Sequence, residues 1–596
     1  MSNESRLSVW RFVDGIIDKS YGKTNFIDEF SEEEWEKYRQ ELLPLDKIYK
    51  VIERKKDLIV LSHGYSAVEL TIELSLIDNC ISELYIGKKL SEEVNKIKGL
   101  KERYSISTLK KYIDNPVKDD EVCALYGLRR TGKSYMMLQS IKYLLDKGEK
   151  VAYFLLNDKV DIKNLKRSVE KLIEAEYKYI YFDEITSVTD LLHNAITFTD
   201  GYAGRGIHII LSGTDSYILR LFESEALGRV IRINTTFISY KEYCHLKGSQ
   251  VNYIKDYLYN GGIFEIDKCY ISSHGDKDRK NKFKDKEDYV KNAITDNIRH
   301  SILAATSKNI DSTLFNLAKN EEKFNTAVEK TVALENRKFL LSVITSEKEI
   351  GSFVSIIRNF DTDIDEDYLI KQFNEKLSIN NFINDYTEEE VSKLKNYLIR
   401  LNVLTEYASY EGKNEETCYL YTQPGLRYRQ LQTMLDLLKE DSSFLNINTK
   451  MKNDIIEHIS DRVEGPLIEH NIICHLLYKY KDNPNIQITQ YHLTEGGEFD
   501  LVLGDKKASN LMIFEIKRGD NNSIKKKWYR WLLNESNICD KIIDDLKYLK
   551  VIDKYLLFNG TTDLNKLIKD DNDEDVNIKH LNMEEFLLNI KDFIKF

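Results

Sequence analysis

The chain has 596 residues, of which 42% are hydrophobic, so it is long enough to form several domains with cores of their own. Its net charge of −11 gives no overall attraction for polyanions, so nucleic acid would have to contact local basic patches. No run of about 18 apolar residues occurs, and the first twenty residues lack the apolar segment of a signal peptide. These features exclude a membrane-spanning chain and favour a cytoplasmic location.

Residues 1–100 form a first region, in which a strand-like stretch precedes a helical one; we assign it no function. From residue 101 to 245, four short apolar runs alternate with segments that can be helical. They read "EVCALY", "KVAYFLL", "KYIYFDE" and "IHIILSG". This alternation is typical of a parallel α/β sheet, so the expected fold class is multidomain α/β.

The downstream half divides into three further regions by its pattern. Residues 246–340 are expected to form a helical lid or linker, with a charged insertion at 268–290 that cannot bury a core. Residues 341–432 end in a helix, a strand, a charged turn and a second strand, the order of a winged helix. Residues 433–596 again alternate helix with strand, which predicts a second α/β unit.

The stretch "YGLRRTGKS" at 126–134 has the complete spacing of a Walker A loop and lies between a predicted strand and a predicted helix. Glycines allow backbone N–H groups to surround phosphates. Lys133 would reach the β- and γ-phosphates, and the Ser134 hydroxyl would ligate Mg²⁺. The residues expected to bind nucleotide here are Gly127, Arg130, Thr131, Gly132, Lys133 and Ser134.

Acidic and polar residues follow two later strands of the same predicted sheet. "YIYFDEI" places Asp183 at the carboxyl edge, where it would hold Mg²⁺, and Glu184 beside it, where it could polarise the attacking water. "ILSGTDS" brings Ser212 and Thr214 to the same edge, where they could sense the γ-phosphate or the water. The sequence therefore predicts a site for ATP and Mg²⁺.

Several stretches in order resemble bacterial and archaeal AAA-type ATPases that carry a C-terminal domain of formerly unknown function, DUF4143. They are "RYSISTLKKYI", "YGLRRTGKS", "YIYFDEI", "ILSGTDS", "ALGRVIRI", "YLYNGGIFEI" and "YTQPGLRYRQL". The resemblance begins near residue 103 and continues to the end of the chain. It implies an AAA+-like core in which Arg229 contacts nucleotide, in its own or a neighbouring subunit; the sequence equally allows Arg229 to be a surface residue.

A second group of charged residues lies in the last region. Glu469 projects from the apolar stripe of a predicted helix, and a carboxylate that faces inward needs a partner. Strand alternation puts Glu498, Asp500 and Val502 on one face of their strand, and Glu515 and Lys517 on one face of the next. Three carboxylates and a lysine are therefore expected to converge.

This spacing resembles the PD-(D/E)XK nuclease motif, with Phe499 where proline often stands. The resemblance implies that Asp500 and Glu515 hold Mg²⁺, that Lys517 orients the nucleophile and that Glu469 belongs to the catalytic set. A hairpin with charged edges, or an inactive remnant of the fold, would have the same pattern. Beyond the motif, "KRGDNNSIKKKWYRWLL" interleaves cations with aromatic residues and suits either nucleic acid or a solvated amphipathic surface.

These features together predict an ATPase coupled to a Mg²⁺-dependent nuclease. The expected partners are nucleic acid, with DNA favoured, and a further copy of the chain or another protein; the expected pathway is defence or DNA maintenance. The alternative is a nucleotide-dependent switch or scaffold that binds DNA or a partner protein and cuts nothing.

Overall fold

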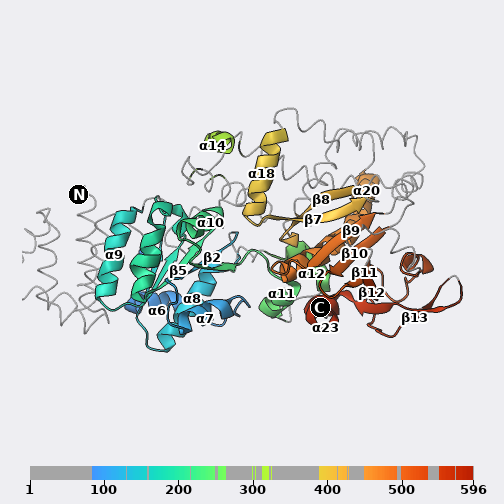
Figure 1. Cartoon of the computed structure of the whole chain (residues 1–596), viewed down its shortest axis with the longest axis horizontal. Coiled ribbons are helices and arrows are strands. Elements are labelled where there is room, and N and C mark those ends of the chain that lie inside the picture. Colours follow the sequence, from blue (N-terminus) through green and yellow to red (C-terminus); the bar gives the residue numbers. More distant parts are fainter. Residues whose placement is uncertain are drawn as a thin grey trace, which may run out of the picture. The chain divides into compact units, whose positions relative to one another are not determined.

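The computed structural model describes much of the chain after residue 82. The described residues are 83–128, 131–157, 160–188, 190–214, 216–248, 253–262, 299, 303, 312–320, 324, 388–411, 414–425, 427–428, 449–492, 498–533, 549–570 and 572–594. Residues up to Thr235, with Leu303, belong to one compact unit, and the remaining described residues belong to a second (Figure 1). Most of the predicted region 1–100 and the charged insertion at 268–290 lie outside the described residues.

The first unit is built on a six-stranded sheet in the order β1-β3-β4-β5-β2-β6. All neighbouring strands are parallel except β1, which pairs antiparallel with β3. The strands are β1 (Glu83–Tyr85), β2 (Val122–Tyr126), β3 (Val151–Leu155), β4 (Tyr179–Asp183), β5 (His208–Gly213) and β6 (Val230–Asn234). The four predicted apolar runs are therefore β2 to β5, and the prediction of a mainly parallel α/β sheet is confirmed.

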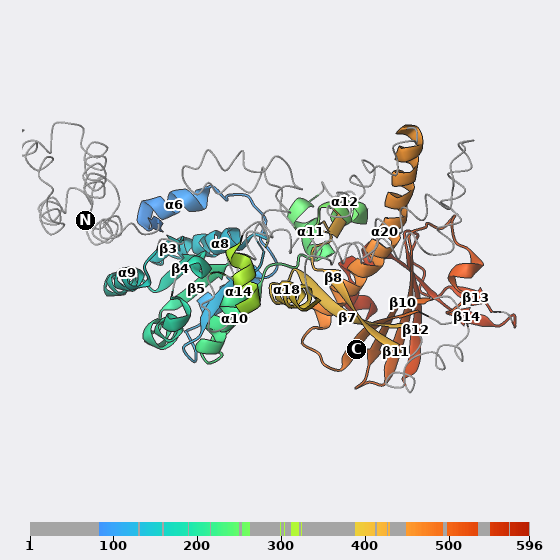
Figure 2. The same cartoon turned by 90° about the horizontal axis from the view of Figure 1, so that it is seen from above.

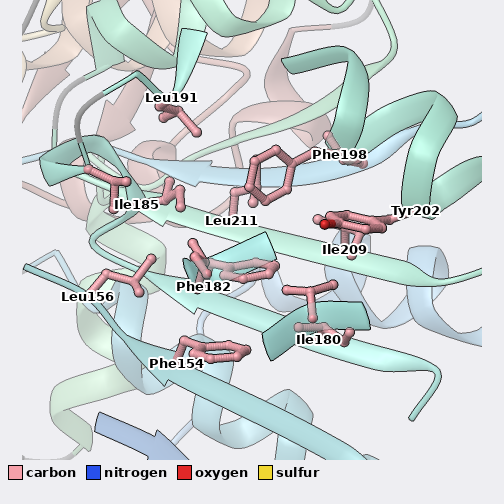
Figure 3. Packing of buried hydrophobic residues seen from close by; sticks show 14 of the residues in the cluster. Phe154, Leu156, Ile180, Phe182, Ile185, Leu191, Phe198, Tyr202, Ile209 and Leu211 are labelled. Atoms are coloured by element: carbon pink, nitrogen blue, oxygen red, sulfur yellow. The ribbon is translucent and has the colours of Figure 1, made fainter. Parts of the chain in front are cut away.

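Helices cover both faces of this sheet, because the strands carry apolar side chains on both faces. They are α6 (Gly87–Asn95), α7 (Ile106–Asp114), α8 (Lys133–Asp146), α9 (Ile162–Glu174) and α10 (Ser216–Glu225), with short helical turns between Ile185 and Arg205. Phe154, Phe182 and Leu211 face the cluster that contains Phe198 and Tyr202 (Figure 3). Tyr153 and Tyr181 face the opposite cluster, formed with α6, α7 and α8. Figure 2 shows α6 and α8 beside β3.

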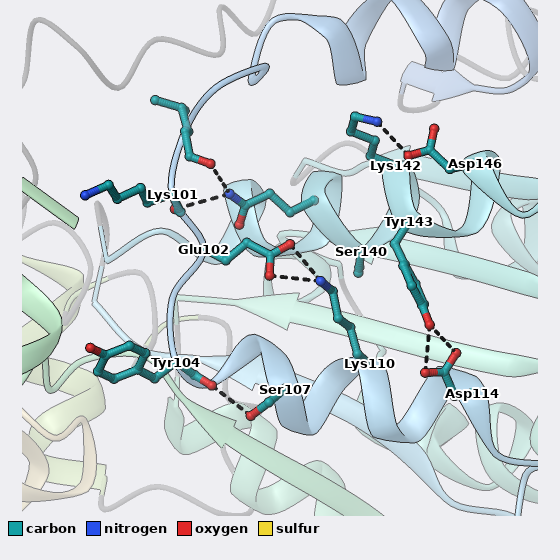
Figure 4. Close-up of polar contacts among 12 residues, drawn as sticks. Lys101, Glu102, Tyr104, Ser107, Lys110, Asp114, Ser140, Lys142, Tyr143 and Asp146 are labelled. Carbon is teal, nitrogen blue, oxygen red and sulfur yellow. Dashed lines mark hydrogen bonds and ion pairs between the residues drawn. The ribbon is translucent and has the colours of Figure 1, made fainter. Parts of the chain in front are cut away.

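Polar contacts join α7 and the segment before it to α8, the helix that begins at the predicted phosphate loop. The Tyr143 hydroxyl donates to both oxygens of Asp114 at 3.0 Å (Figure 4). Gln139 donates to the Leu100 carbonyl at 3.2 Å. Lys110 forms an ion pair with Glu102 at 2.7 Å. The contacts of Tyr143 and Gln139 hold α7 and the segment before it against the body of α8.

The second unit contains a seven-stranded sheet in the order β15-β12-β11-β10-β9-β7-β8, most of which Figure 1 shows in succession. Its strands are β7 (Leu404–Glu411), β8 (Asn414–Tyr421), β9 (Ile486–His492), β10 (Glu498–Asp505), β11 (Asn510–Lys517), β12 (Lys550–Phe558) and β15 (Lys579–Asn582), beside a small hairpin of β13 (Leu567–Lys569) and β14 (Asp575–Asn577). Its helices are α11 (Tyr240–Lys247), α12 (Tyr253–Asn260), α14 (Ser312–Lys319), α18 (Glu388–Arg400), α20 (Thr449–Tyr480), α22 (Met583–Leu588) and α23 (Ile590–Phe593).

The sequence did not predict how the hairpin of β7 and β8 is connected. The predicted order of helix, strand, turn and strand is present as α18, β7 and β8. However, β7 also pairs in parallel with β9, from Ala408 opposite Thr489 to Glu411 opposite His492. The hairpin thus shares one sheet with the strands of the region 433–596, and the predicted limits of the individual domains stay predictions.

Helix α20 covers one face of this sheet. Ile468, Ile472 and Ile473 pack in one cluster with Leu501, Phe514 and other residues of β10 and β11. Within the described ranges, no helix combines the length and the apolar character needed to cross a membrane.

Candidate functional site

The first candidate site begins at the loop between β2 and α8. Gly127 has φ +149° and Gly132 has φ +90°, a region that side-chain-bearing residues rarely adopt, so glycine is required at the second position in particular. Helix α8 starts directly after Gly132, and its N-terminus presents backbone N–H groups to the loop. Arg130, predicted to contribute to this loop, lies outside the described residues.

Lys133 is turned back into the loop. Its side chain is only 5% exposed, and its ammonium donates to the carbonyl oxygens of Gly127 at 2.8 Å and Leu128 at 2.9 Å. Ser134 follows at the second position of α8 and is half-buried. A buried cation and a hydroxyl therefore stand where a Walker A loop receives phosphates and their Mg²⁺.

Thr131 connects the loop to the end of β6. Its hydroxyl donates to the Leu128 carbonyl at 2.8 Å and lies 2.7 Å from the hydroxyl of Thr235. The buried guanidinium of Arg103 donates to the carbonyl oxygens of both threonines at 2.6 Å. The loop is consequently held from outside by residues that the motif itself does not contain.

The predicted acids meet the end of β5 at the carboxyl edge of the sheet. Asp183 is 1% exposed and accepts hydrogen bonds from the Ser212 hydroxyl and, at 2.7 Å, from the hydroxyl of Tyr153. Glu184 is half-buried, and Thr214 donates to its Oε2 at 3.3 Å. The structure thus brings all four predicted residues of this edge together. Ser212 donates a hydrogen bond to Asp183, and Thr214 donates one to Glu184.

The backbone at this edge is specialised. Glu184 has φ +58°, a left-handed conformation that is uncommon for residues other than glycine. A Cβ atom on Gly213 would lie 2.3 Å from Cγ2 of Thr186, so the end of β5 can lie this close to the turn after β4 only with glycine there. Both residues adjoin the hydrogen-bonded pairs Asp183–Ser212 and Glu184–Thr214.

Arg229 lies at the amino ends of the strands, opposite the carboxyl edge that carries the phosphate loop. The next residue, Val230, pairs with Val122 at the start of β2, whereas the phosphate loop follows Tyr126 at the end of that strand. Its guanidinium forms ion pairs with Asp200 and, at 3.6 Å, with Asp120. Within one chain Arg229 is therefore not brought to Lys133, and a contact with the nucleotide of a neighbouring subunit stays a prediction.

The second candidate site lies where β10 and β11 pair. Leu501 is opposite Phe514 at the end of their ladder, and Asp500 and Glu515 are the next residues of the two strands. The Lys517 ammonium contacts both carboxylates, Asp500 Oδ2 at 2.8 Å and Glu515 Oε2 at 2.9 Å. Asp500 Oδ2 also accepts from the backbone N–H of Ile516 at 2.6 Å. The predicted Asp500, Glu515 and Lys517 are thus brought together.

A β-bulge interrupts the alternation that was expected along β10. The register with β9 shifts between Phe499 and Val502, and these two residues pack in the same cluster although they are three apart. Glu498, Asp500 and Val502 therefore do not simply alternate along one regular face. Glu498 instead pairs with His492 at 3.2 Å, and bulges of this kind commonly redirect a side chain beside a functional site.

Burial and mutual repulsion shift the pKa values at this site. Burial raises the pKa of Asp500, although the Lys517 ammonium opposes the shift. Burial, and next the charge of Asp500, raise the pKa values of both Glu515 and Glu469 well above the ordinary value for a glutamate. Burial disfavours the charge of Lys517, but Asp500, Glu515 and Glu469 outweigh it and raise its pKa. The cluster thus holds more acidic groups than its single lysine can balance.

Two oxygen atoms at this site accept no hydrogen bond from any residue that the structure describes. They are Oδ1 of Asp500, whose residue is 0% exposed, and Oε1 of Glu515, whose residue is 3% exposed. A buried carboxylate oxygen without a donor is costly, and a cation would satisfy both atoms. No set of three His, Cys, Asp or Glu side chains in the described ranges is arranged to hold a metal ion, but Mg²⁺ commonly takes one or two carboxylates and keeps its waters.

Glu469 reaches this cluster from α20. It is half-buried and follows Ile468, whose side chain packs on the sheet. One turn earlier, Glu464 pairs with Arg518 at 3.2 Å and with Lys255 at 3.4 Å. Because Arg518 follows Lys517 directly, this pair fixes α20 to the end of β11.

Several residues that contact the first site were not found from the sequence. Each of these residues, Tyr153, Arg103 and Thr235, lies in a different element from the residue that it contacts, so local spacing does not reveal the contact. Tyr153 is also one of 37 tyrosines in the chain. Tyr153 could have been singled out only from the strand register, which puts Leu155 opposite Asp183.

Residues 119–244 match the family model of an AAA domain. The matched stretch contains the phosphate loop, Asp183 at the end of β4, Glu184 after it and the polar end of β5. No curated protein matches the chain. The match supports an AAA-type ATPase family for this unit, and with it a nucleotide-dependent ATPase activity.

Proposed function

We propose that this protein is an ATPase whose nucleotide state controls a Mg²⁺-dependent nuclease site at Asp500, Glu515 and Lys517, with DNA as the favoured substrate. The observation that carries the proposal is the pair of buried oxygens, Asp500 Oδ1 and Glu515 Oε1, that receive no hydrogen bond from the described residues. They belong to neighbouring residues of paired strands, which suits two ligands of one cation.

The residues of the second site divide the chemistry of phosphodiester cleavage. Asp500 and Glu515 would hold Mg²⁺, which when bound acidifies water and offsets the charge of a phosphate. Lys517 remains an ammonium at neutral pH because its pKa is raised, so its role is to attract and orient anions and not to remove a proton. Glu469, with its raised pKa, is the group able to hold a proton beside them.

The nucleotide site follows the same division of roles. Lys133 would bind the β- and γ-phosphates, and Ser134 and Asp183 would hold the accompanying Mg²⁺. Glu184 would polarise the attacking water, and its hydrogen bond from Thr214 orients the carboxylate for that role. The AAA-domain match supports this half of the proposal.

The test uses the purified full chain with plasmid, single-stranded DNA and RNA, in Mg²⁺ or Mn²⁺, with and without ATP. We expect cleavage by the wild type and none by Asp500→Ala or Lys517→Ala, while ATP hydrolysis stays within about three-fold because separate residues serve it. Asp482→Ala, in the exposed turn after α20, is the matched control and should cut normally. Lys133→Ala should change the rate of cleavage if nucleotide controls it.

The contrary outcomes separate the alternatives. Cleavage that persists in Asp500→Ala would assign the activity elsewhere. If the wild type cuts no substrate under any condition but still hydrolyses ATP, the protein is better described as a nucleotide-dependent switch or scaffold.

A further inference from the structure

Tyr153 makes a buried hydrogen bond that no phosphate-loop motif requires. It lies in β3 opposite Tyr181 of β4 and is 3% exposed. Because strand residues alternate, Tyr153, Tyr181 and Asp183 share the face covered by α8. The Tyr153 hydroxyl donates to Asp183 Oδ2 at 2.7 Å, while its ring lies 5.6 Å from the ring of Tyr85.

The other oxygen of Asp183 is also occupied. Oδ1 accepts from the Ser212 hydroxyl and from the backbone N–H of Glu184 at 3.1 Å. Donors therefore come from β3, from β5 and from the residue after Asp183 itself. Three donors from different directions fix both the rotation and the plane of the carboxylate, so its remaining lone pairs have one defined direction.

We infer that Tyr153 is a positioning residue of the nucleotide site: its hydroxyl holds Asp183 in the orientation that receives the cation bound with the nucleotide phosphates. Partners that orient a metal-binding carboxylate usually matter nearly as much as the carboxylate itself. The inference rests on the proposed nucleotide function and is independent of the nuclease site.

Tyr181 supplies a close comparison. It is fully buried on the same face, one strand away, and its hydroxyl lies 3.0 Å from the Ser140 hydroxyl of α8. A tyrosine hydroxyl on this face can therefore be satisfied without an acid of the site. Tyr181→Phe removes an equally buried hydroxyl and hydrogen bond, so it is a matched control for Tyr153→Phe.

The experiment measures the affinity for a fluorescent ADP analogue as Mg²⁺ is varied, and again in EDTA. Tyr153→Phe should raise the Mg²⁺ concentration needed for half-maximal tightening about 10- to 100-fold, the usual effect of losing such a partner. Its affinity in EDTA should stay within about two-fold of the wild type, because no phosphate contact is removed. Tyr181→Phe should match the wild type in both conditions.

An equal Mg²⁺ requirement in Tyr153→Phe and Tyr181→Phe would reduce Tyr153 to a packing residue and overturn the inference. A wild type that binds no nucleotide would instead refute the proposed function of the site. Tyr153→Phe keeps the ring against Tyr85 and should fold. If it does not, Ser212→Ala removes the donor to the other oxygen, and an unchanged Mg²⁺ requirement there would equally overturn the inference.

Discussion

The two candidate sites place buried acids at strand ends but treat their oxygens differently. In the first unit, both oxygens of Asp183 accept hydrogen bonds from neutral donors, Tyr153, Ser212 and the Glu184 backbone. In the second unit, Asp500 and Glu515 share one lysine, and each leaves one oxygen without a donor in the described chain. The comparison shows that protein donors already hold the carboxylate of the first site, whereas the second site leaves acceptor oxygens that our proposal assigns to a cation.

The largest effect should follow from removing the Lys133 ammonium from the first site. Lys133→Ala takes away charge-assisted hydrogen bonds to phosphate and should weaken ATP binding at least about 100-fold, measured with a fluorescent analogue. Glu184→Gln should bind ATP normally but slow its hydrolysis about 100-fold or more, because a general base is lost and no phosphate contact changes.

The control for Lys133→Ala is Lys142→Ala, on the same helix, where Lys142 is exposed and pairs with Asp146 at 2.6 Å. It should leave binding unchanged. Equal turnover of ATP by wild type and Glu184→Gln would remove Glu184 from its role.

A second prediction compares the replacement of one acid by its amide at each site, measured without metal. Asp183→Asn puts an NH₂ group against fixed donors and should destabilise the first unit by about 1–3 kcal/mol. Glu515→Gln should change the stability of the second unit in EDTA by less than about 1 kcal/mol, because it removes a buried charge that is already disfavoured. Hydrogen exchange resolves the opening free energy of each unit separately.

Adding Mg²⁺ completes the comparison. It should slow hydrogen exchange near Asp500 in the wild type but not in Glu515→Gln, since only the wild type offers both carboxylates. A large loss of stability in Glu515→Gln in EDTA would show that the second site, like the first, is complete without a cation.

The smallest predicted effect is a loss of folding stability at low pH through His475 of α20. Its Nε2 accepts from the Tyr240 backbone N–H at 2.8 Å, so the histidine is neutral there, and burial lowers its pKa to about 4. Because the folded pKa lies below the ordinary value near 6.5, stability is complete above that value and is lost as pH falls toward 4. Between pH 8 and 5.5, the second unit should lose roughly 1 kcal/mol through this residue.

The measurement is hydrogen exchange in the second unit at both pH values, in the wild type and in His475→Gln. The variant should be less stable at pH 8 but should lose less stability on acidification. An identical pH dependence in the two proteins would contradict the assigned tautomer.

The parts of the sites that follow from short spacing were predictable. The glycines and Lys133 lie within one loop, and Asp500 and Glu515 lie within one hairpin whose register is set locally. The position of Arg229 also follows from order alone, since a residue just before a parallel strand lies at the amino edge of the sheet. That argument would have excluded Arg229 from its own nucleotide site without a structure.

Other contacts depend on tertiary pairing that a single sequence does not define. Tyr153 contacts Asp183, 30 positions later, only because β3 lies beside β4 in one register. Arg103 contacts Thr235 across 132 positions. The bulge at Asp500 is likewise invisible in the strand pattern, because it appears only against β9.

The parallel pairing of β7 with β9 determines where the chain can be cut. The hairpin ends at Tyr421 and its partner begins at Ile486, with the whole of α20 between them. A fragment that ends in this interval keeps β7 and β8 as an isolated two-stranded hairpin, which is marginally stable in water. A fragment that begins there exposes the edge of β9, a template for aggregation. A soluble C-terminal fragment is therefore expected only when it starts before Leu404.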